Sequence, residues 1–143
     1  MIALANVADV LGLPARETAA RSPFGLISRI EHGLPVDTLA RVAQLLAPGD
    51  TQFKYRLVPK ATLDRRKSSR RLSTEEGTRL ARVARIWWLA LDVWQSEAEA
   101  RDFLFRRHAM MEDRRPIDVV IQSEFGAELV SDILGGLKYG SAA

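Results

Sequence analysis

The sequence predicts an all-α protein, because every strong periodic signal along the chain is helical. Apolar residues recur at three- and four-residue steps, and the segments 73–76 and 96–99 both fit the capping box that begins a helix. The alternation of polar and apolar residues that is typical of strands does not occur between turn signals. The 143 residues are 47% hydrophobic, which suffices for one ordinary domain or two small ones.

Charged residues divide the chain into a basic and an acidic region, although the net charge is only +3. Residues 54–71 contain eight Lys and Arg against the single acid Asp64, whereas acids outnumber bases after Gln95. A basic region suits a phosphate backbone, and an acidic region suits a basic protein surface. We therefore expect different partners for the two regions. The alternative is that both are solvated helix faces.

Two classes of protein are disfavoured by what the sequence lacks. It has no cysteine, no glycine-rich phosphate loop and no Gly-x-Ser-x-Gly motif, and its two histidines, His32 and His108, are far apart. We therefore predict neither an enzyme nor a metal or cofactor site. Because no apolar run of about 18 residues and no basic leader occur, we expect a cytoplasmic protein that does not enter a membrane.

The first half, residues 1–71, is expected to form a helix-turn-helix part, of which residues 1–22 are only weakly patterned. Glycine and proline punctuate the remainder of this half. They divide it into four expected helices, near 23–32, 36–46, 50–57 and 60–70. The last two have the order of helix, tight break and helix that a helix-turn-helix motif requires.

The fourth of these helices is the candidate DNA-reading helix. Pro59 cannot continue the preceding helix but suits the first turn of a new one, so the fourth helix sets off at an angle. It would bury Leu63 and present Thr62, Arg65 and Arg66 outward, where Arg pairs with guanine and Lys or Thr contacts phosphate. The candidate DNA-contacting residues are Lys60, Thr62, Arg65, Arg66, Lys67 and Arg70. The turn lacks glycine, which leaves its exact geometry open. Because helix-turn-helix patterns are degenerate, an ordinary helical hairpin is the alternative.

The helix that begins after Ser73 is apolar on nearly all sides. One face carries Leu80, Val83, Ala84, Trp87, Ala90, Leu91 and Trp94, and a second face carries Ile86, Leu89 and Val93. Such a helix must be covered nearly all round, which is hard for a domain of residues 72–143 alone. We therefore predict a homodimer with contacts at Ile86, Trp88, Leu89 and Val93. The alternative is a central helix with Trp88 partly exposed.

Three shorter elements complete the expected helical set. A helix over Ala98–Phe105 is closed by His108, and a charged loop then leads to a helix that starts at Pro116 and runs to about Ile121. Ser123 caps the last helix. Its expected buried stripe is Phe125, Leu129, Val130, Ile133, Leu134 and Leu137. The pair Gly135-Gly136 costs this helix roughly 2 kcal/mol, so we expect close approach or a bend there.

The second half resembles the toxin-binding domain of Xre/MbcA/ParS-type antitoxins, which are the partners of RES-domain toxins. The resemblance covers Leu72 to Gly140 well and the first half loosely. It rests on the order and spacing of five segments, 79–84, 98–105, 115–120, 124–130 and 134–140. In the first half, the string Thr62 to Arg66 resembles the end of the DNA-binding part of the same family.

This resemblance implies an antitoxin of a type II toxin-antitoxin system, with operator DNA and a RES-domain toxin as its partners. It would occlude a toxin that consumes NAD and would repress its own operon. The family's terminal stretch lies against the toxin, which implies contacts at Lys138, Tyr139 and Gly140. The charged loop departs from the family's small glycine-containing loop and adds Met111, Arg114 and Arg115 as candidate contacts. The alternatives are a stand-alone transcriptional regulator whose second half only dimerises and an enzyme of unknown type.

Overall fold

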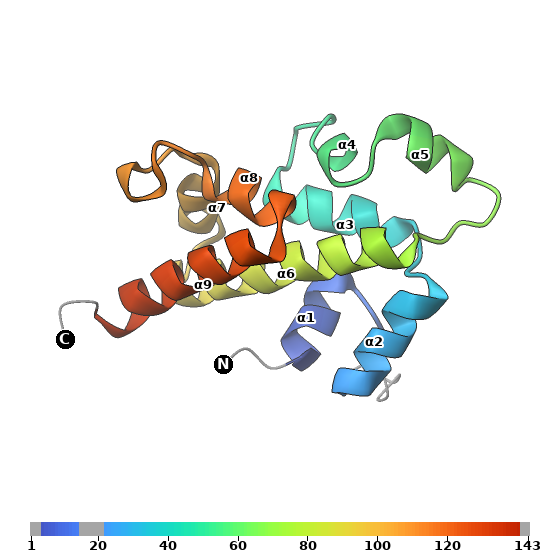
Figure 1. The fold of residues 1–143 in the computed structure, drawn as a ribbon, viewed down its shortest axis with the longest axis horizontal. Coiled ribbons are helices and arrows are strands. Elements are labelled where there is room, and N and C mark those ends of the chain that lie inside the picture. Colours follow the sequence, from blue (N-terminus) through green and yellow to red (C-terminus); the bar gives the residue numbers. More distant parts are fainter. Residues whose placement is uncertain (1–3, 15–21, 141–143) are drawn as a thin grey trace.

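The computed structural model describes residues 4–14 and 22–140, and over these ranges the protein is helical (Figure 1). Nine α-helices and one short 3₁₀ helix form there, and pairing between extended segments is limited to isolated bridges. The all-α prediction is confirmed. The elements are α1 (Leu4–Leu11), α2 (Pro23–His32), α3 (Asp37–Leu46), α4 (Lys54–Leu57), α5 (Lys60–Arg65), α6 (Thr74–Trp94), α7 (Glu97–Phe105), η2 (Ala109–Met111), α8 (Pro116–Gln122) and α9 (Glu124–Tyr139).

The long helix α6 lies at the centre of the molecule. It contacts α1, α2, α3 and α4 from the first half of the chain and α7, α8 and α9 from the second half. Figure 1 shows α6 running along the long axis of the molecule with α9 beside it. Its buried apolar side chains, among them Leu80, Val83 and Trp87, belong to a single core that draws on both halves of the chain.

Helices of the first half therefore supply the cover that we expected from a second copy of the chain. Ile86, a predicted dimer contact, is only 1% exposed and lies in the core of one molecule. This part of the prediction was wrong, because helices outside residues 72–143 also pack on α6 and cover its apolar faces. Trp88, Leu89 and Val93 are partly buried, so the homodimer stays a prediction for these three residues.

Capping residues begin the helices of the second half where the sequence predicts them. Ser73 Oγ accepts a hydrogen bond from the Glu76 N–H (3.2 Å), and Glu76 Oε1 accepts one from the Ser73 N–H (2.8 Å), which completes the capping box of α6. Ser96 caps α7 through the Glu99 N–H (3.2 Å). Pro116 begins α8, and Ser123 caps α9.

Two helices of the first half are shorter than predicted, whereas α2 and α3 lie where we expected them. Helix α4 begins at Lys54 and not near residue 50, since Asp50 Oδ1 accepts from the Gln52 N–H (2.9 Å), a local bond that competes with helix formation. Helix α5 ends at Arg65, and Arg70 adopts a left-handed φ of 57° that no helix permits.

The weakly patterned start of the chain contains a helix that we did not predict. Helix α1 packs on α6 and buries Val7, Ala8 and Leu11. These residues recur at helical spacing, so the sequence does contain a helical pattern here, but the pattern extends over only about two turns. Residues 1–3 and 15–21 lie outside the described part of the chain.

The buried stripe of α9 differs from the predicted one. Val130 and Leu134 are buried as expected, but Phe125, Leu129 and Leu137 are exposed, and that part of the prediction was wrong. The helix packs on α6 and α8 through a stripe that includes the small residues Gly126 and Ala127. Small side chains allow a close approach between helices that large apolar residues would prevent. The face of α9 that contains Gly126 and Ala127 is therefore buried, and the adjacent face with Phe125 and Leu129 is exposed.

Contacts between the two halves give the described residues one continuous core. Arg79 Nη1 donates to the Leu57 carbonyl oxygen (2.7 Å), and Arg101 Nε donates to that of Leu45 (2.9 Å). The rings of Phe53 and Phe105 meet edge to face at 5.5 Å. The domain division between residues 71 and 72 stays a prediction. In the part of the chain that is described, no helix is long and apolar enough to cross a bilayer.

Gly126 is expected to be required for the packing of α9 on α8. A methyl group at this position would overlap the backbone carbonyl of Val119. We expect Gly126→Ala to lower the free energy of unfolding by about 1–3 kcal/mol, although alanine favours helix by about 1 kcal/mol. The measurement is urea denaturation followed by circular dichroism.

Gly135→Ala is the matched control in the same helix, because an added methyl group meets nothing within 4 Å there. We expect Gly135→Ala to leave the free energy of unfolding unchanged or to raise it by up to about 1 kcal/mol. Equal effects of the two substitutions would contradict the packing argument.

Candidate partner groove and basic surface

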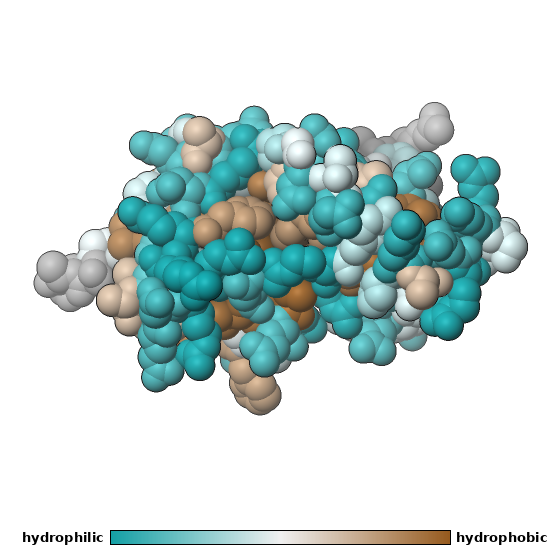
Figure 2. All heavy atoms as spheres, turned by 90° about the horizontal axis from the view of Figure 1, so that it is seen from above, coloured by the Kyte–Doolittle hydropathy of each residue, from teal (hydrophilic) through white to brown (hydrophobic). Residues whose placement is uncertain are grey.

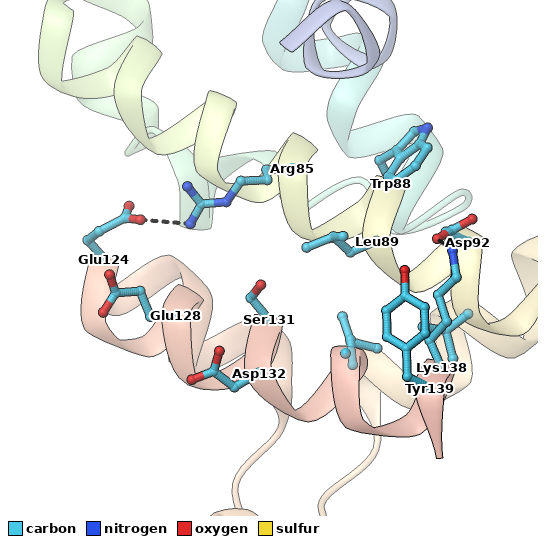
Figure 3. A pocket seen from close by; sticks show the side chains of 13 residues that line it. Arg85, Trp88, Leu89, Asp92, Glu124, Glu128, Ser131, Asp132, Lys138 and Tyr139 are labelled. Atoms are coloured by element: carbon cyan, nitrogen blue, oxygen red, sulfur yellow. Dashed lines mark hydrogen bonds and ion pairs between the residues drawn. The ribbon is translucent and has the colours of Figure 1, made fainter. Parts of the chain in front are cut away.

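A groove of about 620 Å³ lies between α9 and the second half of α6 (Figure 3). It is lined by Arg85, Trp88, Leu89, Asp92 and Val93 of α6 and by Glu124, Glu128, Ser131, Asp132, Leu134, Gly135, Lys138 and Tyr139 of α9. The groove brings together two sets of residues that the sequence analysis treated separately. Three predicted dimer contacts, Trp88, Leu89 and Val93, share it with two predicted toxin contacts, Lys138 and Tyr139.

One end of the groove is closed by a cluster of charges around Glu124. Arg85 Nη2 lies 2.7 Å from Glu124 Oε1, and Arg82 Nε lies 3.2 Å from Glu124 Oε2. Burial alone would raise the pKa of Glu124, but hydrogen bonds and charge from Arg85 and Arg82 outweigh it and lower that pKa. Arg82 also donates to the carbonyl oxygens of Val120 (3.3 Å) and Ile121 (3.2 Å), which joins α6, α8 and α9.

The other end of the groove is held by an ion pair between Lys138 and Asp92. The hydrogen bond with Asp92 raises the pKa of Lys138. Lys138 is therefore engaged within the chain, whereas Tyr139 is 75% exposed. Gly140 ends α9 with a left-handed φ of 78°. Of the three predicted terminal contacts, Tyr139 offers the most free surface.

Two acidic side chains stand along the middle of α9 without a cationic partner among the described residues. Glu128 and Asp132 continue, at four-residue spacing, the row that begins with Glu124. In Figure 3 a dashed line joins Glu124 to Arg85, and none reaches Glu128 or Asp132. Gly135 beside them has open space around it and makes no close approach within the chain. The groove thus combines an apolar wall with uncompensated negative charge.

The charged loop between α7 and α8 is tightly hydrogen-bonded. Its backbone is closed by His108 N–H to Arg114 O (3.2 Å) and Asp113 N–H to His108 O (2.9 Å), and Glu112 and Asp113 adopt positive φ values of 55° and 63°. The His108 ring is hydrogen-bonded to the Phe103 carbonyl oxygen (2.8 Å), so it closes α7 as expected.

Only one of the three predicted loop contacts, Arg114, has an exposed position. Met111 is 3% exposed and belongs to the core, so its prediction as a partner contact was wrong; the neighbouring Met110 is the exposed methionine. The Arg115 guanidinium makes two bonds of 2.9 Å to the carboxylate of Asp118. Arg114 is exposed and pairs with Glu112 (3.0 Å) within the loop.

The basic surface around α5 lies at the opposite end of the molecule from the terminal turn of α9 (Figure 1). Lys60, Arg65, Lys67 and Arg70 are exposed, and Thr62 is half-buried and accepts from Arg65 Nη2 (3.3 Å). Seen from above, hydrophilic side chains cover most of the end that carries α4 and α5 (Figure 2). Because α5 ends at Arg65, Lys67 and Arg70 lie in the following loop and not on the helix.

Arg66 does not point freely outward, and in this respect the sequence prediction was wrong. Its guanidinium contacts both carboxylate oxygens of Glu76, with Nε–Oε1 at 3.2 Å and Nη2–Oε2 at 3.3 Å. Glu76 is buried, and it also completes the capping box of α6. Arg66 thus anchors the end of α5 to the start of α6. The ten-residue separation of this pair gives no local signal by which the sequence could have revealed it.

The Arg66–Glu76 pair is expected to make stability depend on pH. Burial would raise the pKa of Glu76, but hydrogen bonds from Arg66 and Ser73 outweigh it and lower that pKa below its ordinary 4.5. The stabilising contribution is therefore present at neutral pH and is lost as the pH falls through the lowered value. We expect Glu76→Gln to cost about 1–2 kcal/mol at pH 7 and less as the pH approaches 3, measured by urea denaturation.

Glu75→Gln is the control for this series, because Glu75 is exposed beside it. In Glu76→Gln, the amide oxygen of glutamine can still accept from the Ser73 N–H, so the comparison of this variant with the natural chain isolates the effect of the charge. A difference between Glu76→Gln and the natural chain that does not change with pH would contradict this role of the ion pair.

Comparison with known families assigns the basic surface around α5 and most of the groove along α9 to two different domains. Residues 25–85 match the antitoxin Xre-like helix-turn-helix domain, and residues 89–140 match the antitoxin Xre/MbcA/ParS C-terminal toxin-binding domain. No curated protein matches the chain. The first match contains the basic surface, and the second contains α9 and most of the groove. Among residues 4–14 and 22–140, no group of His, Cys, Asp and Glu is placed to hold a metal ion.

Proposed function

We infer that this chain, which belongs to the Xre/MbcA/ParS-type antitoxin family, binds a RES-domain toxin and occludes the site at which that toxin consumes NAD. The observation that carries this proposal is the match of residues 89–140 to a toxin-binding domain, since these residues contain the exposed end of α9. An antitoxin that acts by occlusion needs a rigid, complementary surface and no catalytic group. It would act in the cytoplasm, where both NAD and the operator are found.

The construction of α9 suits an occluding element. The Glu124 cluster and the Lys138–Asp92 pair tie the first and last turns of α9 to α6. The exposed Tyr139 is therefore presented on a helix that is already formed, so little conformational entropy is lost when a partner binds it. Tyrosine is also among the residues that most often dominate binding energy at protein interfaces.

Self-association through the groove would compete with toxin binding in this proposal. Trp88, Leu89 and Val93 are the predicted dimer contacts that keep some exposure, and they line the same groove as Tyr139. One face of this size cannot hold a second copy and a toxin at once. A dimer that coexists with the toxin complex would need another contact surface.

We further propose that the antitoxin represses its own operon through the surface around α5. The match of residues 25–85 to a helix-turn-helix domain supports DNA binding, and Lys60 and Arg65 are the exposed basic residues on α5 itself. Lys67 and Arg70 in the following loop suit phosphate contacts, which position a protein on DNA without reading its sequence. Arg66 is not among the proposed DNA contacts, because its guanidinium is paired with the carboxylate of Glu76.

Removing the exposed tyrosine is expected to weaken neutralisation without unfolding the protein. Tyr139→Ala should reduce protection against the adjacent toxin, because a central aromatic contact can contribute about 2 kcal/mol or more. Deleting residues 139–143 should reduce it further and spares the Lys138–Asp92 pair. Cell growth and cellular NAD during co-expression measure the effect. Phe24→Ala, at an exposed aromatic residue on α2, is the control, and full protection by the deletion variant would refute occlusion by the terminus.

DNA binding is expected to depend on the two exposed basic residues of α5. Lys60→Ala combined with Arg65→Ala should weaken specific operator binding at least tenfold in a gel-shift titration, since each groove contact contributes about 1–3 kcal/mol. Neutralisation of the toxin should persist. Affinity should also fall steeply with salt, with a slope of about 0.9 for each neutralised phosphate. Arg106→Ala with Arg114→Ala removes two exposed charges elsewhere, and an equal loss in that control would show that only net charge matters.

A further inference from the structure

We propose that the outward face of α9, from Phe125 to Tyr139, is a docking helix for a basic protein surface that contains an apolar groove. This proposal rests on the proposed function only in taking the cognate toxin as that protein. Four of the seven exposed large hydrophobic side chains in the described part of the chain lie on α9. Phe125 is 84% exposed, Leu129 is 47% exposed and Tyr139 is 75% exposed.

Helical geometry places the three exposed anchors on one side of α9. Leu129 and Tyr139 follow Phe125 by four and fourteen residues, and each separation is close to a whole number of turns at 3.6 residues per turn. The anchors span about 21 Å along the helix, at 1.5 Å for each residue. An amphipathic helix with apolar anchors at such spacing binds by laying that side into a groove on its partner.

The charge beside the anchors determines which partner fits this face. Asp132 follows Phe125 by seven residues and lies between Leu129 and Tyr139, and Glu128 flanks the same side. Neither carboxylate has a cationic partner among the described residues, whereas nearby Glu124 and Asp92 are both paired. Two uncompensated negative charges among apolar anchors favour a partner with lysine or arginine around its groove.

A second copy of the chain fits the same face poorly. In a symmetric pair with antiparallel helices, each residue contacts the partner residue at the mirrored position. The midpoint between Phe125 and Tyr139 is residue 132, so Asp132 would meet Asp132 of the other copy. Like charges that face each other destabilise such a contact, and neither helix offers a free cation there to balance them.

The apolar area of the face is large enough for a specific contact. An aromatic side chain buries roughly 150–250 Å² at an interface, so Phe125 and Tyr139 together supply about half of the 800 Å² that each partner contributes to an interface of standard size. Leu129 and the apolar wall of the groove would supply part of the rest. Because both ends of α9 are tied to α6, the helix needs no folding on binding.

The experiment measures binding of the purified full-length protein to the toxin encoded beside it, by titration calorimetry at low and high salt. Glu128→Lys with Asp132→Lys should weaken binding at least tenfold, and binding of the natural chain should weaken at high salt. Glu31→Lys with Glu99→Lys changes the net charge equally at exposed positions elsewhere and should bind as the natural chain does. Equal affinities of the two double variants would overturn the proposal.

A second pair of variants tests the apolar anchors. Phe125→Ala with Leu129→Ala should weaken binding at least tenfold, whereas Phe24→Ala with Ile27→Ala, at exposed positions on α2, should not. All these side chains are exposed, and unchanged thermal melting verifies folding. If Phe125→Ala with Leu129→Ala turns a dimer into a monomer in light scattering and leaves toxin affinity intact, the face is a contact between copies and the proposal fails.

The two proposals fail in different ways. If the natural chain itself does not bind the adjacent toxin, the toxin is not the partner, and the docking proposal falls with the proposed function. If the natural chain binds and neutralises the toxin while both α9 double variants bind equally well, the proposed function stands and the docking face alone is refuted.

Discussion

Burial of α6 on nearly every side is the constraint on which the rest of the structure depends. A helix of 21 residues with apolar groups on several faces needs partners in several directions, and this chain draws them from both of its halves. The helix-turn-helix region and the toxin-binding region therefore share one core. As a consequence, the basic surface and the end of α9 are fixed at opposite ends of one continuous helix and do not hang from a flexible linker.

Arginine side chains stabilise this arrangement by donating hydrogen bonds to carbonyl oxygens at the ends of short helices. Arg101 binds a carbonyl oxygen near the end of α3, Arg79 binds one at the end of α4, and Arg82 binds two at the end of α8. Helices of four to ten residues are marginal in isolation, and their last carbonyl groups lack partners within the helix. Charged donors from α6 and α7 thus hold these short elements in place, which also explains why many arginines of this chain are unavailable to a ligand.

The arrangement of α9 separates structural from exposed groups along a single helix. Its inward side uses Gly126 and Ala127 to approach α8 and α6 closely, and its outward side keeps Phe125 and Leu129 at the surface. A monomer gains nothing from exposing large apolar residues where small ones are buried. The arrangement is physically sensible when another protein covers the outward side, in keeping with the toxin-binding family to which this region belongs.

The sequence alone determined whatever depends on neighbours three or four residues away: the helical class, the caps at Ser73 and Ser123, the start of α8 at Pro116 and the order of segments that indicates the family. The tertiary structure decided which of two apolar faces is buried and which charges are free. It buried Gly126 and Ala127 and left Phe125 exposed, placed Ile86 and Met111 in the core, and paired Arg66 with Glu76 while Arg65 stayed exposed. Adjacent arginines such as Arg65 and Arg66 differ here because packing and ion pairing join positions beyond the reach of a single helical turn. Local periodicity carries no information about such pairs.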